Sequence, residues 1–173
     1  MLYSLGFDNV SILNGGFAEW TRLHLPIETK KNIFESANFQ SKIKVEKFID
    51  KDEILKTLTK NSSLLVNALT EDIHSGNNPR YGRPGRIPGS INIPFHNFLE
   101  PNTEKFKSIK KINSIFESKG ITSDKKIINY CGGGIAATLN AFALFQAGFR
   151  KFKVYDNSMS EWAMDETLLI EIG

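Results

Sequence analysis

The sequence has one cysteine, three histidines and no long apolar run, and each scarcity excludes a class of protein. A single cysteine excludes an internal disulfide framework. The histidines, His24, His74 and His96, are scattered rather than clustered with cysteine, so we expect no metal site and no cofactor. No apolar stretch approaches the roughly 18 residues of a membrane span, and residues 1–9 lack the layout of a signal peptide. We therefore expect a cytoplasmic protein that does not interact with membranes.

A strong charge bias is also absent. The formal net charge is +3, and the lysines are dispersed among acidic residues rather than arranged in a stripe. Nucleic acid is therefore not expected as a partner. With 173 residues, of which 40% are hydrophobic and 24% charged, the chain can bury one good core. We expect one complete domain with additional segments.

The only cysteine, Cys131, stands between an apolar run at residues 127–130 and the glycine loop Gly132-Gly133-Gly134, which leads into an Ala/Leu-rich helical stretch. Glycines can take positive φ, so successive N–H groups can converge on the sulfur beside the positive end of a helix. Such a site favours a thiolate and stabilises negative charge on an attached sulfur. The pattern predicts covalent sulfur chemistry, although an isolated cysteine is more commonly a small buried hydrophobic residue.

Periodicity and turn residues divide most of the chain into alternating helices and strands. We expect helices at 45–59, which Asp50-Lys51-Asp52 could interrupt, at 106–119 and at 136–147. Strands are expected at 64–66, 90–93, 127–130 and 152–155, and a long loop at 69–86. This alternation indicates an α/β fold with a central, mostly parallel sheet. A ligand is expected at the carboxyl ends of its strands, where Cys131 lies.

An internal repeat organises the chain ends. Residues 6–20 align without a gap with residues 148–162, and both copies read as a Gly-Phe turn, a short strand and a helical turn ending in Glu-Trp. We infer that residues 1–22 are the end of a first domain, 23–44 a polar linker and 45–173 the complete domain. On this reading the chain begins inside a longer tandem protein or derives from one that lost its first half.

Four motifs, in the right order, resemble those of the rhodanese or sulfurtransferase family, specifically the C-terminal half of its tandem two-domain enzymes. They are Leu65-Val66-Asn67-Ala68, the run from Gly85 to Pro94, the run from Cys131 to Ala137, and the closing run from Tyr155 to Trp162. Residues 6–20 are similar to the end of an inactive first domain. The resemblance covers about residues 64–162 and implies a rhodanese-like three-layer α/β fold.

The resemblance also implies a mechanism. Cys131 would take a sulfane sulfur from a donor such as thiosulfate or 3-mercaptopyruvate to form a persulfide. A thiophilic acceptor, such as cyanide, a small thiol or a cysteine of another protein, would then attack the outer sulfur, which is thiol exchange with sulfur as cargo. The backbone N–H groups of the loop would hold the persulfide; its residues are Gly132, Gly133, Gly134, Ile135, Ala136 and Ala137.

The sequence departs from the family pattern at the loop and at the preceding strand. Family thiosulfate enzymes often carry basic side chains after the cysteine, and mercaptopyruvate enzymes a hydroxyl at the third loop position, where this chain has Gly132 and Gly133. The family's Asp-Ala-Arg strand end is Asn67-Ala68-Leu69 here, and a downstream substrate-binding arginine falls at Ile73. The loop itself therefore supports neither donor.

Three arginines of the 69–86 loop are candidates for substrate binding. Arg80 resembles another anion-binding arginine of the family, and Arg83 and Arg86 lie nearby in the same loop. The alternative for these arginines is that they belong to a solvated loop and bind no substrate. A guanidinium suits thiosulfate, sulfite or a carboxylate equally. We predict that Arg80 in particular contacts the donor.

Two alternatives remain open. A cysteine phosphatase or arsenate reductase would need an arginine closing the loop, where this chain has Ala137. A non-enzymatic persulfide-binding or partner-binding module is the second alternative, because tandem members form the active site between two domains and the first is nearly absent here.

Glu161 and Trp162 align in the internal repeat with Glu19 and Trp20, which follow no catalytic loop. We therefore expect Glu161 and Trp162 to cap and pack. Asp156 and Ser158 are expected to be turn and capping residues.

Overall fold

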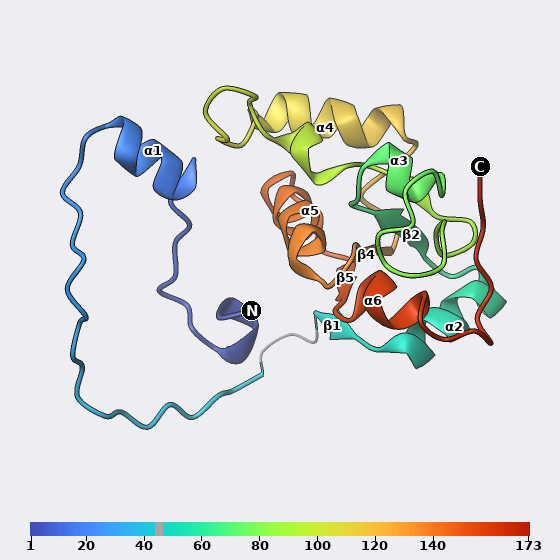
Figure 1. Ribbon diagram of the computed structural model, residues 1–173, viewed down its shortest axis with the longest axis horizontal. Coiled ribbons are helices and arrows are strands. Elements are labelled where there is room, and N and C mark those ends of the chain that lie inside the picture. Colours follow the sequence, from blue (N-terminus) through green and yellow to red (C-terminus); the bar gives the residue numbers. More distant parts are fainter. Residues whose placement is uncertain (44–46) are drawn as a thin grey trace.

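The fold is built on a parallel sheet, which Figure 1 shows in a computed structural model that describes residues 1–43 and 47–173. Five strands occur among these residues, in the order β1-β5-β4-β2-β3, and every neighbouring pair is parallel. They are β1 (Phe48–Ile49), β2 (Leu64–Asn67), β3 (Ile91–Asn92), β4 (Ile127–Tyr130) and β5 (Phe152–Tyr155). The predicted α/β class is confirmed, and this sheet is wholly rather than mostly parallel.

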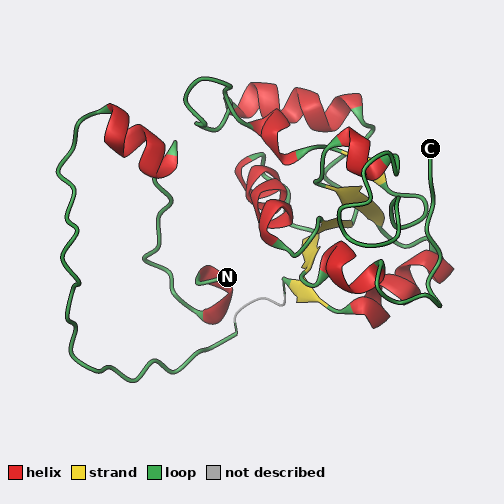
Figure 2. Cartoon of the chain, in the orientation of Figure 1, coloured by secondary structure: helices red, strands yellow, loops and turns green. Residues whose placement is uncertain are grey.

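Helices cover both faces of the sheet, with α4 and α5 on one face and α2 and α6 on the other (Figures 1 and 2). The helices are η1 (Tyr3–Leu5), α1 (Gly16–Arg22), α2 (Lys51–Lys60), α3 (Glu71–His74), η2 (Phe95–Phe98), α4 (Ile109–Ser118), α5 (Ile135–Gln146) and α6 (Ser158–Trp162). Because both faces are covered, all four residues of the central strand β4 are buried. Among the described helices, none is long and apolar enough to cross a membrane.

The start of the complete domain differs from the sequence prediction. The helix expected at 45–59 begins only at Lys51, because the Asp50 carboxylate caps it by accepting a hydrogen bond from the Glu53 N–H at 3.0 Å. Residues 48–49 instead pair with Val154 and Tyr155 as the edge strand β1. Residues 45 and 46, and the predicted domain boundary, lie outside the described residues. The helix therefore starts within Asp50-Lys51-Asp52, where a restart was expected, and the predicted helix over residues 48–49 is wrong.

Two other elements also differ in extent. The helix expected from residue 106 begins at Ile109, after the Ser108 side chain caps it, and Phe106 forms a β-bridge with Leu99 instead. The loop expected at 69–86 contains the short helix α3. The remaining predicted strands and α5 lie within one or two residues of their expected bounds.

The internal repeat is visible in the helices but not in the strands. Helices α1 and α6 begin at aligned positions, where Gly16 and Ser158 have left-handed φ angles of 58° and 53°. The Trp20 indole N–H donates to the Pro26 carbonyl, and that of Trp162 to the Leu169 carbonyl, both at 2.9 Å. The prediction of a strand within residues 10–13 is wrong, since these residues form no strand in the described chain. Its aligned copy β5 is paired on both sides, and residues 10–13 have no such neighbours.

The N-terminal segment contacts the domain through the turn that precedes α4. The Glu19 carboxylate pairs with Lys105 at 2.6 Å, and the Phe106 N–H donates to the Asn14 side chain at 2.9 Å. The Arg22 side chain, followed by Lys105, lowers the pKa of Glu19 to about 2. A few polar contacts therefore join α1 to the domain.

Candidate active site

Cys131 lies at the carboxyl end of β4, the middle strand of the sheet, and only 2% of its surface is exposed. Its backbone N–H donates to the Ser158 hydroxyl at 3.0 Å, and its carbonyl accepts from the Met159 N–H at 3.0 Å. The next carbonyl, that of Gly132, accepts from both the N–H and the hydroxyl of Ser160 at 2.7 Å. The start of α6 thus holds Cys131 and Gly132 in place.

The three loop glycines serve different purposes. Gly134 has a φ of 82°, and a Cβ there would lie 2.6 Å from the Asp156 carbonyl oxygen. A Cβ on Gly132 would overlap the ring and hydroxyl of Tyr81, whereas one on Gly133 would meet only the Ser160 hydroxyl, at 3.7 Å. Only Gly134 therefore uses the positive φ expected of all three, and Gly132 is required by the close approach of Tyr81.

Backbone N–H groups are left unpaired in the loop after the cysteine, where α5 begins. Along the chain after Cys131, the first backbone N–H that donates a hydrogen bond is that of Thr138, to the Gly134 carbonyl at 3.2 Å. Within the described chain, the N–H groups of residues 132–137 make no hydrogen bond. Unpaired N–H groups and the positive end of a helix dipole favour a negative group. The predicted persulfide cradle needs this arrangement.

A pocket of about 270 Å³ opens at Cys131. Its apolar side is formed by Leu69, Ile73 and Phe95, and its polar side by Arg80 and Tyr81. At the mouth, Ile135 is 85% exposed. A cavity of this size has room for a small molecule, and Arg80 gives its lining a positive charge.

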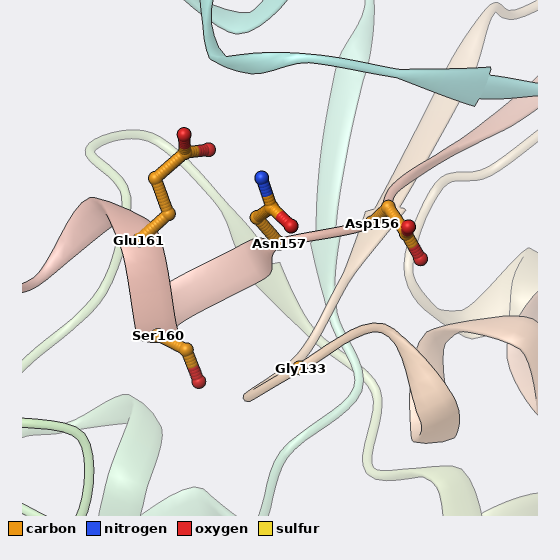
Figure 3. A pocket seen from close by; sticks show the side chains of 5 residues that line it. All are labelled: Gly133, Asp156, Asn157, Ser160 and Glu161. Carbon is orange, nitrogen blue, oxygen red and sulfur yellow. The ribbon is translucent and has the colours of Figure 1, made fainter.

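A second pocket of about 270 Å³ lies across Gly133 from the first and is lined by Gly133, Asp156, Asn157, Ser160 and Glu161 (Figure 3). In Figure 3, Ser160 points from α6 toward the loop that carries Gly133. Glu161 accepts a hydrogen bond from the Tyr155 hydroxyl at 2.6 Å. Burial, followed by this carboxylate, raises the pKa of Tyr155 far above its ordinary value. Glu161 is thus bonded to the end of β5, and Trp162 is fully buried, as expected for residues that pack.

Of the three candidate arginines, only Arg80 lines the Cys131 pocket. Its guanidinium lies 5.9 Å from the centre of the Tyr81 ring. Arg83 instead donates to backbone carbonyls of the C-terminal segment at 2.6–3.2 Å, those of Trp162, Ala163, Asp165 and Leu168. The structure therefore gives Arg83 an anchoring role in place of the predicted substrate binding.

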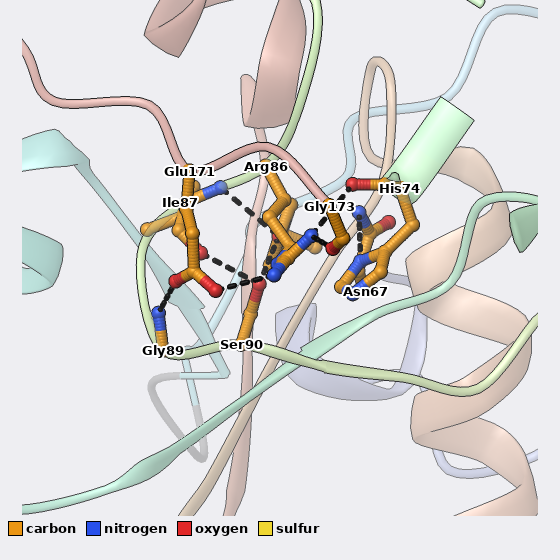
Figure 4. A network of polar contacts seen from close by, with 9 residues as sticks. Asn67, His74, Arg86, Ile87, Gly89, Ser90, Glu171 and Gly173 are labelled. Carbon is orange, nitrogen blue, oxygen red and sulfur yellow. Dashed lines mark hydrogen bonds and ion pairs between the residues drawn. The ribbon is translucent and has the colours of Figure 1, made fainter. Parts of the chain in front are cut away.

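Arg86 is buried in a polar network that Figure 4 shows. It pairs with the Glu171 carboxylate and donates to the carbonyls of His74 and Gly173. Burial, followed by Arg86, lowers the pKa of His74 to about 4, and the His74 ring contacts the Asn67 amide at 3.1 Å. Arg86 therefore stabilises the C-terminal segment against the loop, and its predicted contact with substrate is not supported.

Sequence reasoning missed Tyr81 and Ser160. Tyr81 belongs to none of the sequence motifs. It lies against the cysteine loop only because a segment distant in sequence folds onto that loop. Ser160 stands two residues after Ser158 in the closing motif, so its place near the loop was accessible from the sequence. In the part of the chain that the structure describes, no group of three or more potential metal ligands occurs.

The comparisons with known proteins agree with this fold. The sequence model of the Rhodanese-like domain matches residues 46–165. The chain therefore belongs to the rhodanese-like family.

Among curated relatives, the 3-mercaptopyruvate sulfurtransferase of Mus musculus is 34% identical over 95% of this chain and 56% of its own length. That of Escherichia coli (strain K12) is 29% identical over 99% of this chain and 61% of its own, and the thiosulfate sulfurtransferase of Rattus norvegicus is 30% identical over 94% and 56%. The chain thus spans 56–61% of the length of these relatives.

A similar solved structure is that of an EanB variant with ergothioneine covalently linked with a persulfide cysteine. Its TM-score is 0.87 at 25% identity, and the match covers 99% of this chain and 43% of that one.

Proposed function

We propose that this chain is the catalytic part of a sulfurtransferase in which Cys131 carries a sulfane sulfur as a persulfide. The observation that carries the proposal is the position of Cys131 at the floor of a pocket, beside the unpaired N–H groups of residues 132–137. The names of the relatives, 3-mercaptopyruvate and thiosulfate sulfurtransferase, support the same reaction.

The first half-reaction loads the cysteine. The Cys131 thiolate attacks the outer sulfur of thiosulfate, the new S–S bond forms, and the old one breaks with its electron pair on sulfite. With 3-mercaptopyruvate the C–S bond breaks instead, and its electron pair passes to carbon as the enolate of pyruvate, which takes a proton from water. Arg80 would hold the negative group of either donor.

The second half-reaction removes the sulfur from Cys131. Cyanide or a thiol, free or on a protein, attacks the outer sulfur, and Cys131 leaves as a thiolate. The N–H groups of residues 132–137 stabilise the negative charge that the sulfur carries before and after transfer. We further propose the reducing cytoplasm as the location, since Cys131 must stay free of disulfides to react.

The assay is thiocyanate formation from cyanide with thiosulfate or 3-mercaptopyruvate as donor. We expect turnover with at least one donor, and none after Cys131→Ser. Activity that survives in Cys131→Ser would contradict the proposal. Absence of turnover with both donors would favour the second candidate, a persulfide-binding or partner-binding module.

The phosphatase alternative gains no support. Ala137, at the position where that chemistry needs a loop arginine, is fully buried. The arginine that lines the Cys131 pocket, Arg80, is not part of the loop. We therefore do not pursue this reaction.

We also propose the domain division 1–22, 23–44 and 45–173, with the first segment completing another rhodanese-like unit. Exposed apolar residues of the first copy align with buried residues of the second: Phe7 (42% exposed) with Phe149 (6%), Ile12 (61%) with Val154 (3%) and Phe17 (67%) with Met159 (1%). Fusion of a first rhodanese-like domain that lacks its own last strand before Met1 should protect residues 10–13 from hydrogen exchange. Unchanged exchange would contradict this division.

A further inference from the structure

Tyr81 occupies the place where a side chain of the second loop residue would be. A Cβ built on Gly132 would overlap both the ring and the hydroxyl of Tyr81, so the phenol lies directly against the loop. Tyr81 and Cys131 line the same pocket. Gly132 and Gly133 themselves contribute no side chain beside the sulfur, so the aromatic hydroxyl in this pocket comes from a distant part of the chain.

The neighbours of Tyr81 fix its position. Two residues further on, Arg83 is anchored by its four carbonyl contacts to residues 162–168. Between them, Gly82 turns the chain with a φ of 105°. The Tyr81 ring is half-buried against the core, and Arg80 lies on its outer side. Anchored neighbours of this kind give a side chain a defined place in a site.

The hydroxyl of Tyr81 is a free donor, since it makes no hydrogen bond to any other described residue. A phenol O–H can donate to a negatively charged sulfur, and hydrogen bonds to charged groups are about twice as strong as those between neutral groups. The proton stays on the phenol throughout, so the contact requires no further reactant.

We propose that Tyr81 substitutes for the missing loop side chains, with its hydroxyl donating a hydrogen bond to the sulfur that Cys131 receives and its ring limiting which donors fit. This inference rests on the proposed sulfurtransferase function. On this proposal Tyr81 contacts the substrate and sets the donor preference. It takes the place of the basic or hydroxyl side chains that the cysteine loops of related enzymes carry.

The test compares five variants: Tyr81→Phe, Tyr81→Ala, Gly132→Ser, the double variant Tyr81→Ala/Gly132→Ser, and the control Tyr3→Phe at an exposed position. The readouts are kcat and KM with thiosulfate and with 3-mercaptopyruvate, and the thermal midpoint. Tyr81→Phe keeps the ring, so we expect an unchanged midpoint and a loss in kcat/KM of about tenfold or more, as for one hydrogen bond to a charged group.

The Gly132→Ser change should have opposite effects in two backgrounds. In the wild type the new side chain displaces Tyr81, so activity falls. In Tyr81→Ala it fills the vacated space with a hydroxyl, so activity rises above that of Tyr81→Ala and the ratio of kcat/KM for the two donors changes. A merely structural role of Tyr81 would show the same reversal in the thermal midpoint and would leave the ratio of kcat/KM for the two donors unchanged.

The outcomes separate the two proposals. A wild-type chain that transfers no sulfur overturns both. An active wild type in which Tyr81→Phe stays within twofold of Tyr3→Phe overturns the role of Tyr81 alone. A Gly132→Ser change that lowers activity in both backgrounds overturns the substitution of Tyr81 for a loop side chain.

Discussion

The Ser158 hydroxyl accepts a hydrogen bond from the backbone N–H of Cys131 at 3.0 Å and donates one to the Tyr155 carbonyl at 2.7 Å. Ser158 is fully buried and has a left-handed φ of 53°. One side chain therefore joins the carboxyl ends of β4 and β5 directly behind the reactive sulfur. Ser158 is the first residue of α6 and not its cap, so the capping role expected from the sequence is wrong, whereas its hydroxyl positions the cysteine.

Ser158→Ala should destabilise the fold and slow sulfur transfer. The substitution leaves a buried N–H at Cys131 without an acceptor, which costs about 1–3 kcal/mol. Urea unfolding gives the change in free energy, and thiocyanate formation gives the rate. Ser114→Ala is the matched control, because Ser114 is exposed on α4, and its effect should stay within about 0.5 kcal/mol. Equal stabilities of the two variants would contradict the role of Ser158.

Substitutions in the glycine loop should differ sharply by position. Gly134→Ala should lower the free energy of unfolding by about 1–3 kcal/mol, because alanine is strained at a left-handed φ. The new Cβ would in addition crowd the Asp156 carbonyl. Gly133→Ala should be tolerated, because its Cβ meets only the Ser160 hydroxyl at ordinary contact distance. Thermal unfolding of both variants is the measurement. A Gly133→Ala variant as unstable as Gly134→Ala would show that the loop geometry is different.

Stability should fall as the pH drops from 6.5 toward 4, partly through His74. The pKa of His74 is lowered to about 4, chiefly by burial and then by Arg86, so in this window the unfolded chain binds a proton that the folded chain does not. His74→Asn should reduce the loss of unfolding free energy between pH 7 and pH 4.5. The exposed His24 serves as the control through His24→Asn. The same pH dependence in all three proteins would argue against the role of His74.

Arg80 and Arg83 should give opposite phenotypes. Arg83→Ala removes four contacts to backbone carbonyls and should destabilise the fold by about 2–3 kcal/mol. Arg80→Ala should leave the unfolding free energy nearly unchanged and raise KM for anionic donors about tenfold. Denaturant titrations and donor kinetics on both variants make the comparison. A normal KM in Arg80→Ala would remove this residue from the donor site.

The strands that could be predicted are those whose burial shows in the sequence. β2, β4 and β5 are apolar runs, and α5 ends before Gly148, which has a positive φ. The two-residue strand β1 carries no such pattern and depends on pairing with β5. Residues 10–13 show the converse, since a strand pattern does not form a strand without neighbours.

The site was predictable only in its local part. Cys131 and its loop are contiguous, so their pattern is visible in the sequence. Arg83 and Arg86 look like further substrate-binding candidates in the chain, and their actual roles depend on carbonyls at residues 162–168 and on Glu171, which are distant in sequence. The overlap of Tyr81 with the space above Gly132 likewise arises only in three dimensions.

The mass of the intact protein after incubation with thiosulfate tests the central claim most directly, because it reports the loaded cysteine without requiring a known acceptor. We expect the wild-type chain to gain one sulfur atom that cyanide removes, and Cys131→Ser to gain none. A wild-type chain that gains no sulfur, or a Cys131→Ser variant that gains as much, would contradict the account.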